Sequence, residues 1–288
     1  LLLTEEETHY SDMVGTVESM TSKSYKYQES QLIAEMEFVD LNGDGEFENT
    51  KEVQYEYNDS GYKTSTITVE MAEGELQTIT WITNTFTESG DLLLKVTERS
   101  DNGNQSPDSR TTDFYTYYSN GNLREHRREI DSDVIPPFER LDVWQFTYDA
   151  QDNTLTELSQ QDLGPEGTVA NWELRAYYYN LDNKKLSETV YRGSGTLSNE
   201  EERYSYWFSY DENQQELIRF LQADHDADGT LDFTELRSKL YDTNKNLFQT
   251  VTQVDTDGNG TFDTSSRENN HFTFIEDGLQ YILSIVYD

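Results

Sequence analysis

The stretch that decides the fold runs Tyr204-Ser-Tyr206-Trp-Phe208-Ser-Tyr210-Asp-Glu-Asn-Gln-Gln-Glu-Leu217. Its aromatic rings recur at every second residue, and alternate residues of a β-strand point to the same face. The row of rings ends at Tyr210, and a polar run continues from there to Leu217. Polar runs rich in Asp, Asn and Gly are typical of turns. The stretch therefore predicts a strand, a turn and a return strand.

The same pattern recurs along the chain at a nearly fixed period. An aromatic residue followed by a polar turn stands at nine positions, 29 to 33 residues apart: Tyr27, Tyr57, Phe86, Tyr118, Tyr148, Tyr179, Tyr210, Tyr241 and Phe274. A return strand comes after each turn, and then a second, acidic or Gly-rich turn. Self-similarity at a fixed period is the signature of a repeat architecture. We therefore expect an all-β protein of about nine tandem β-hairpins.

The width of such a sheet predicts its curvature. Nine hairpins amount to roughly 18 antiparallel strands, which at ~4.8 Å per strand would make a flat sheet about 85 Å wide. Wide sheets twist, and then curl or close. We expect a curled antiparallel sheet that forms a barrel-like or spiral shell. Repeat arrays bury their core between neighbouring units, so a hydrophobic fraction of 34% is sufficient.

Composition excludes several classes of function. The 288 residues include 57 Asp or Glu and 21 Lys or Arg, which gives a net charge of −36. This charge argues against nucleic acid as a partner, because phosphate binding needs clustered cations. No apolar run approaches 18 residues, so no membrane span is expected. The absence of Cys excludes disulfides and thiolate metal sites.

No linker or change of composition interrupts the repeats. The sequence therefore predicts a single β-hairpin repeat domain over residues 21–288. Residues 1–20 carry no clear repeat and are expected to form an N-terminal tail or cap.

The aromatic and acidic residues at each anchor resemble a known motif. Phe146-Thr-Tyr148-Asp149 and Phe208-Ser-Tyr210-Asp211 are similar to the Tyr-x-Tyr-Asp pattern of the YD or RHS repeats of bacterial surface and toxin proteins, with Phe in place of the first Tyr. The resemblance covers roughly residues 25–288. It implies β-sheet shells that enclose or display other polypeptides. The period near 31 is longer than the unit typical of that family, and its Gly-Arg turn is absent here.

The acidic turn at residues 224–235 matches the 12-residue calcium-binding loop at every ligand position. Asp, Asp and Asp stand at positions 1, 3 and 5, Gly at 6, Thr at 7, Asp at 9 and Glu at 12. Oxygen ligands at this spacing are what Ca²⁺ requires, with a bidentate Glu at position 12. The predicted ligands are Asp224, Asp226, Asp228, Thr230, Asp232 and Glu235.

Two further turns match the same pattern through position 9. Their predicted ligands are Asp255, Asp257, Asn259, Thr261 and Asp263 in one turn, and Asp40, Asn42, Asp44, Glu46 and Glu48 in the other. Position 12 is Ser266 or Lys51, so closure needs another carboxylate, such as Glu268 or Glu52, or water. The alternative is a solvated turn without an ion, because Asp, Asn and Gly make good turns by themselves. We interpret the weaker matches at Asp101 to Asp108, Asp131/Asp133 and Asp162 as plain turns.

Residues 217–240 leave one ambiguity open. An apolar run, the loop and a second apolar run also fit a helix–loop–helix EF-hand. The repeat register from Tyr210 to Tyr241 and the Val- and Thr-rich segment 250–254 favour strands instead.

Motifs for catalysis are scarce. The four His residues, His9, His126, His225 and His271, form no metal-ligand spacing, and there is no Gly-x-Ser-x-Gly elbow or phosphate-binding loop. The sequence thus favours a non-enzymatic, calcium-binding β-repeat protein with a structural, adhesive or shell role. We expect it to be secreted, periplasmic or on the cell surface. The alternatives are a glycan-binding or glycan-cleaving module and a part of a larger toxin-like or polymeric surface assembly. The expected partners are calcium and either a glycan or another surface protein, and the chain would be able to oligomerise.

Overall fold

The computed structural model describes residues 2–10, 17–103, 105–134, 138–162, 169–275 and 278–287. Within these ranges the chain forms 19 β-strands and no helix, which confirms the all-β prediction. The strands are β1 (Leu2–Tyr10), β2 (Val17–Gln28), β3 (Gln31–Asp40), β4 (Asn49–Tyr57), β5 (Lys63–Ala72), β6 (Glu75–Phe86), β7 (Leu92–Ser100), β8 (Ser109–Tyr117), β9 (Leu123–Asp131), β10 (Arg140–Tyr148), β11 (Thr154–Asp162), β12 (Val169–Tyr179), β13 (Lys185–Ser194), β14 (Glu200–Tyr210), β15 (Glu216–Asp224), β16 (Phe233–Tyr241), β17 (Leu247–Asp255), β18 (Thr264–Ile275) and β19 (Gly278–Tyr287).

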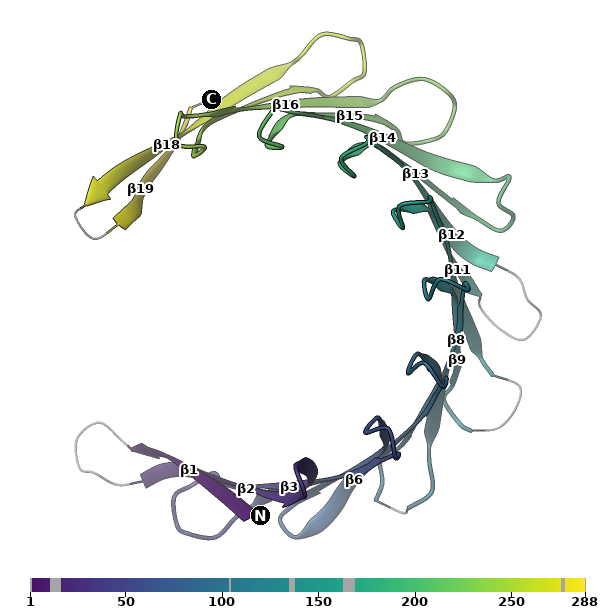
Figure 1. Ribbon diagram of the computed structural model, residues 1–288, viewed down its shortest axis with the longest axis vertical. Coiled ribbons are helices and arrows are strands. Elements are labelled where there is room, and N and C mark those ends of the chain that lie inside the picture. The colour runs from purple at the N-terminus through teal and green to yellow at the C-terminus, as the bar shows by residue number, and fades with distance from the viewer. Residues whose placement is uncertain are drawn as a thin grey trace. The chain divides into compact units, whose positions relative to one another are not determined.

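The chain divides into two compact units at β10, between Val143 and Trp144. From β1 to β9 in the first unit, and from β11 to β19 in the second, each strand pairs antiparallel with the next one in the chain (Figure 1). This meander order confirms the prediction of tandem hairpins. Both units hold the same repeat, and a single domain over residues 21–288 stays a prediction.

The segment expected as a tail or cap contains strand. β1 pairs with β2 from Leu2 opposite Lys26 to Tyr10 opposite Val17. The hairpin pattern therefore extends into residues 1–20, although the aromatic repeat does not.

Five of the tight turns among the described residues are built on an Asp or Asn side chain. After β14, Asp211 Oδ1 accepts hydrogen bonds from the backbone N–H of Asn213 (2.8 Å) and of Gln215 (2.9 Å). Gln214 between them takes a left-handed conformation, with φ of 66°. The same side-chain bonds recur at Asn58, Asp149, Asn180 and Asp242. An acid or amide after the anchor therefore satisfies backbone donors of these turns, and after Phe86 the Thr87 hydroxyl accepts the equivalent bond from the N–H of Asp91 at 2.9 Å.

Four tyrosines at or beside the anchor positions tie their repeat to the one before it. The Tyr210 hydroxyl donates a hydrogen bond to the backbone carbonyl of Lys185, 25 residues earlier, at 2.9 Å. Equivalent bonds join Tyr57 to Leu32 (2.8 Å), Tyr117 to Leu92 (2.8 Å) and Tyr241 to Glu216 (3.0 Å). The constant offset explains why the period varies so little.

One anchor lies one residue away from the position that the sequence pattern predicts. Tyr117 makes the hydrogen bond to the preceding repeat, whereas Tyr118 lies in the turn and is 39% exposed. Both residues are tyrosines, and the pattern of an aromatic residue followed by a polar turn fits either of them. The strand register, which pairs Tyr117 with Leu123, decides between them.

Few side chains in the described part of the chain are fully buried. The buried apolar ones are Val53, Ile79, Trp172, Val190 and Ala223. Most other strand side chains are half-buried. Backbone ladders and cross-strand side-chain pairs therefore contribute more to this fold than a deep apolar core does.

The alternative of a helical EF-hand over residues 217–240 is wrong. β15 and β16 flank the acidic loop and pair antiparallel from Ile218 opposite Ser238 to Ala223 opposite Phe233. The repeat register prevails there over the local apolar runs.

The anchor hydrogen bond is testable with a single hydroxyl deletion. Tyr210→Phe leaves the Lys185 carbonyl without its partner, which should cost about 1 kcal/mol and lower the melting temperature by about 2 °C. Tyr178→Phe is the matched control, since Tyr178 lies in the same unit and is 64% exposed. Thermal melts followed by circular dichroism should show a decrease for Tyr210→Phe alone. Equal melting curves for both variants would contradict the anchor role.

Candidate metal centre

The three predicted calcium loops occupy equivalent places in the repeat. They connect β3 to β4, β15 to β16, and β17 to β18, and each begins at the last residue of a strand. These first residues are Asp40, Asp224 and Asp255, which are 1%, 5% and 1% exposed. Burying a carboxylate is costly unless hydrogen bonds or a cation compensate it. Position 1 is thus the point where each loop needs a partner for negative charge.

Backbone donors supply part of that compensation. Asp40 accepts hydrogen bonds from the N–H groups of Asn42 (3.1 Å), Gly43 (2.6 Å) and Gly45 (2.8 Å). Burial raises the pKa of Asp40, but the N–H groups of Gly45, Gly43, Asn42 and Asp44 together hold it below its ordinary value. The carboxylate therefore stays ionised in the loop.

The residue at position 6 completes the same bond in all three loops. The N–H of Gly45, Gly229 and Gly260 donates to Oδ2 of the position-1 aspartate at 2.8, 3.0 and 2.8 Å. These glycines have φ between 87° and 91°, a conformation that residues with a Cβ rarely adopt. The glycine of the calcium-loop pattern is thus explained by the turn.

The carboxylate at position 9 closes each loop. Glu48, Asp232 and Asp263 each accept a hydrogen bond from the N–H of position 2, at 2.7 Å in every case. The hydroxyl of Thr256 also donates to Asp263, and the side-chain and backbone hydrogen bonds from Thr256 lower the pKa of Asp263. The position-9 acid is therefore held over the start of its own loop.

The result is a cluster of three acids in each loop. The groups are Asp40, Asp44 and Glu48; Asp224, Asp226 and Asp232; and Asp255, Asp257 and Asp263, each with one oxygen per residue within 4.8 Å of the others. At that separation two unit charges repel by about 1 kcal/mol in water and by about 3.5 kcal/mol at an effective dielectric constant of 20. Such a group favours a divalent cation between its oxygens.

One oxygen in these clusters has no hydrogen-bond partner. Asp224 Oδ1 is buried and unsatisfied, while Oδ2 of the same carboxylate accepts from Gly229. A buried charged oxygen without a donor is rare in folded proteins. Asp226 and Asp232 belong to the same group, so all the nearby acid oxygens are acceptors. A cation is the partner that would satisfy this atom.

Other predicted ligands, at positions 3, 5 and 7, take part in hydrogen bonds within their own loops. Asp228, at position 5, accepts from the hydroxyl and the N–H of Thr230, which lower its pKa, and it is not part of the three-acid group. Asn42 and Asn259 likewise accept from the backbone of the residue two positions later. The residues at position 7, Glu46, Thr230 and Thr261, donate their N–H groups to position 5.

Glu235, the predicted bidentate ligand at position 12, lies away from its loop. It is on β16, where its Oε1 accepts from Arg219 at 2.6 Å and lies 3.5 Å from Arg237. Glu52, a candidate for closure of the first loop, accepts instead from Gln54 (2.7 Å). These loops therefore close at position 9, because the next element is a strand rather than a helix and carries position 12 away.

Two of the weaker sequence matches share features of the backbone arrangement of these loops but, where the structure describes them, lack a group of three acids. The N–H of Asp101 donates to Asp108 at 2.8 Å, and Asp131 is buried like the other position-1 residues. Among the described residues these loops hold no group of three acids. Their classification as plain turns stays a prediction. The loop after Asp162 lies outside the described residues.

The two acidic loops of the second unit touch each other. A Cβ placed on Gly258 would come within 1.7 Å of the backbone oxygen of Leu231, at position 8 of the neighbouring loop. Their main chains are therefore in direct contact, which sequence reasoning missed. Gly43 holds the same position 4 in the 40–48 loop, so the glycine alone could not have indicated this contact.

Gly258→Ala tests this contact. Both Gly258 (φ 67°) and Gly260 (φ 87°) take left-handed conformations, so Ala at either should cost about 1–2 kcal/mol. A Cβ on Gly260 meets nothing within 4 Å, whereas one on Gly258 would push the loops apart. We expect Gly258→Ala to lower the melting temperature further than Gly260→Ala. Equal decreases would contradict the packing of the two loops.

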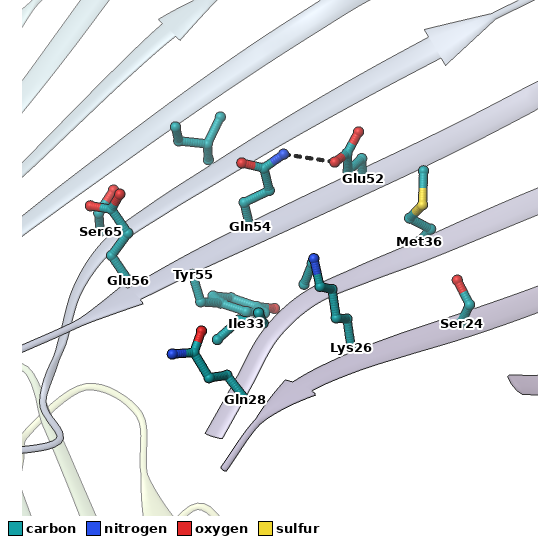
Figure 2. A pocket seen from close by; sticks show the side chains of 12 residues that line it. Ser24, Lys26, Gln28, Ile33, Met36, Glu52, Gln54, Tyr55, Glu56 and Ser65 are labelled. Atoms are coloured by element: carbon teal, nitrogen blue, oxygen red, sulfur yellow. Dashed lines mark hydrogen bonds between the residues drawn. The ribbon is translucent and has the colours of Figure 1, made fainter. Parts of the chain in front are cut away.

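Two hollows lie elsewhere, on faces of the sheet. The β2–β5 hollow, about 520 Å³, is lined by side chains such as Ser24, Lys26 and Met36, and Gln54 donates to Glu52 at its wall (Figure 2). The β12–β15 hollow, about 430 Å³, is lined by residues of the second unit, among them Arg175 and Tyr206. Neither lining includes a residue of the acidic loops, so a cation site and a hollow would be separate features.

No family model and no curated protein matches this sequence. Among solved structures, the chain is similar to TcdB2-TccC3-TEV, with 10% identity and a TM-score of 0.28 over 92% of this chain and 17% of that one. It is also similar to a porin-like protein from Bacteroides uniformis, with 11% identity and a TM-score of 0.31 over 82% of this chain and 93% of that one. This chain thus spans less than one fifth of the length of the first. The described residues include no helix that is long and apolar enough to cross a membrane.

Proposed function

We propose that this protein is a calcium-binding, non-catalytic β-repeat protein in which the ions stabilise the loops of the hairpin sheet. The observation that carries the proposal is the buried, unpartnered Asp224 Oδ1 within a group of three acids. Two further loops repeat the arrangement with the same backbone frame. Its role would be structural or adhesive, and its setting secreted, periplasmic or cell-surface.

The chemistry of the clusters favours calcium among common cations. Every acid in the three groups offers oxygen, and hard cations prefer oxygen ligands. The groups contain no His, and the chain has no Cys, so the soft ligands that favour zinc or copper are missing from them. The loops are largely exposed beyond position 1, so water is available to complete the six to eight ligands of Ca²⁺.

The proposed setting is based on affinity and charge. Extracellular calcium modules bind their ions at about 10⁻⁴–10⁻³ M, a range that three carboxylates and solvent would reach. Three ions would add six positive charges to a chain of −36, so the protein would remain strongly acidic. The ions would thus reduce the repulsion between the carboxylates of each loop, and the protein would stay highly charged and therefore soluble. Membership of the YD or RHS family, and a place in a larger surface assembly, are part of this hypothesis.

Calcium should raise the stability of the fold. A ligand that binds only the folded state adds RT ln(1 + [L]/Kd), about 2.7 kcal/mol per site at 100-fold excess over Kd. We expect chelator to lower the melting temperature and calcium to restore it better than magnesium, whose octahedral geometry suits these loops less. Isothermal titration calorimetry should show calcium uptake. An unchanged melting curve together with no heat of binding would leave the loops as plain turns.

Two carboxylate variants separate a loop ligand from a strand ion pair. Asp232→Asn removes a member of the acid group, and Glu235→Gln removes the partner of Arg219. The increment in melting temperature on adding calcium should fall in Asp232→Asn and persist in Glu235→Gln. The melting temperature without calcium should decrease in Glu235→Gln, because an ion pair is lost. The reverse order of increments would support the 12-residue loop and contradict closure at position 9.

A further inference from the structure

The β12–β15 hollow gathers an unusual share of the protein's cations. Arg175, Lys185, Arg192 and Arg219 line it, from a total of 21 Lys and Arg in the chain. They come from β12, β13 and β15. At about 430 Å³ the hollow is within the usual range for small-ligand pockets, roughly 300–1,000 Å³.

These cations are held in a network of carboxylates. Glu188, which is 8% exposed, lies 2.5 Å from Lys185 and 3.2 Å from Arg175. Glu173 lies 2.7 Å from both Arg175 and Arg192. Burial raises the pKa of Glu173, but hydrogen bonds from the two arginines hold it below its ordinary value.

Every cation that lines the hollow is already paired with a carboxylate. Glu202 pairs with Arg192, and Glu235 pairs with both Arg219 and Arg237. Glu188 itself lines the hollow, so the lining offers carboxylate acceptors as well as cationic donors. A neutral ligand rich in hydroxyl groups, each of which donates and accepts, matches such a lining. A polyanion does not, because no positive charge is left uncompensated and the chain carries −36.

Aromatic rings form one wall of the hollow. Tyr204, Tyr206 and Phe208 are alternate residues of β14 and share one face of the sheet. Lys185 Nζ lies 4.9 Å from the centre of the Phe208 ring, and the Arg192 guanidinium lies 5.2 Å from that of Tyr204. Rings beside paired polar groups offer apolar contact and hydrogen bonds together.

Two hydrogen-bond donors at the hollow are unused. Arg219 Nε is buried without a partner. Among the described residues the Tyr206 hydroxyl makes no hydrogen bond either. A buried donor without a partner calls for an acceptor, and a hydroxyl-bearing ligand would supply one.

We propose that the β12–β15 hollow binds a neutral oligosaccharide. Tyr206 and Arg219 would donate to its hydroxyl groups, the ion-paired carboxylates would accept from them, and the β14 rings would contact its C–H faces. The site is independent of the acidic loops, so the failure of either proposal leaves the other standing. The β2–β5 hollow is larger but has one cation, Lys26, and one ring, Tyr55, whose hydroxyl already donates to Glu35.

Binding of defined sugars tests the proposal. The whole chain, in calcium, would be titrated with neutral hexasaccharides of glucose, mannose, xylose and N-acetylglucosamine, and with hexagalacturonate as the anionic counterpart. Calorimetry or ligand-observed NMR should show binding of at least one neutral sugar at millimolar concentration. No binding by any neutral sugar, or binding of hexagalacturonate alone, would overturn the proposal.

Matched variants then locate the site. Tyr206→Phe and Arg219→Lys each remove a donor while keeping the ring or the charge, and each should weaken binding about tenfold. Trp207→Phe, one residue away but on the opposite face, and Gln54→Ala in the β2–β5 hollow should leave it unchanged. Loss of binding in either control, with Tyr206→Phe and Arg219→Lys unaffected, would place the site elsewhere. Far-UV circular dichroism and the melting temperature would verify that each variant is folded.

Discussion

A tyrosine hydroxyl that reaches a backbone carbonyl 25 residues earlier determines the frame of this protein. The bond is made by Tyr57, Tyr117, Tyr210 and Tyr241, and it fixes these four repeats against the ones before them. The residue after most anchors then builds a tight turn on its own side chain. Because strands in a meander alternate in direction, successive connections lie at opposite ends of the strands. The acidic loops are among those connections, so the anchors indirectly decide where the acids gather.

Much of the fold could be predicted because most repeats carry aromatic residues at alternate strand positions, followed by a polar turn. The period from Tyr148 to Tyr241 is a constant 31 residues, and it outweighed the apolar runs that suggested a helical EF-hand. Two adjacent tyrosines, Tyr117 and Tyr118, fit the aromatic-and-turn pattern equally, although a strict period of 31 residues from Phe86 to Tyr148 favours Tyr117. The choice between them depends on strand register, which bulges at the ends of many hairpins shift by one residue.

The candidate site was predicted in part for a similar reason. Positions 1, 3, 5, 6 and 9 of the acidic loops can be read from local turn chemistry, and the structure brings three acids together in each loop. Position 12 depends on the element after the loop, and β16 carries Glu235 to Arg219 instead. Two further features join residues that are distant in the sequence: the contact of Gly258 with the neighbouring loop, and the charge network around Glu188. No local sequence pattern could predict them.

The count of bound calcium ions tests the account most directly. Native mass spectrometry of the whole chain, in calcium with excess magnesium, would report how many Ca²⁺ each molecule retains. The three acid groups at Asp40, Asp224 and Asp255 predict three ions per chain. Retention of none, or magnesium in place of calcium at all sites, would contradict the claim that these loops are calcium sites.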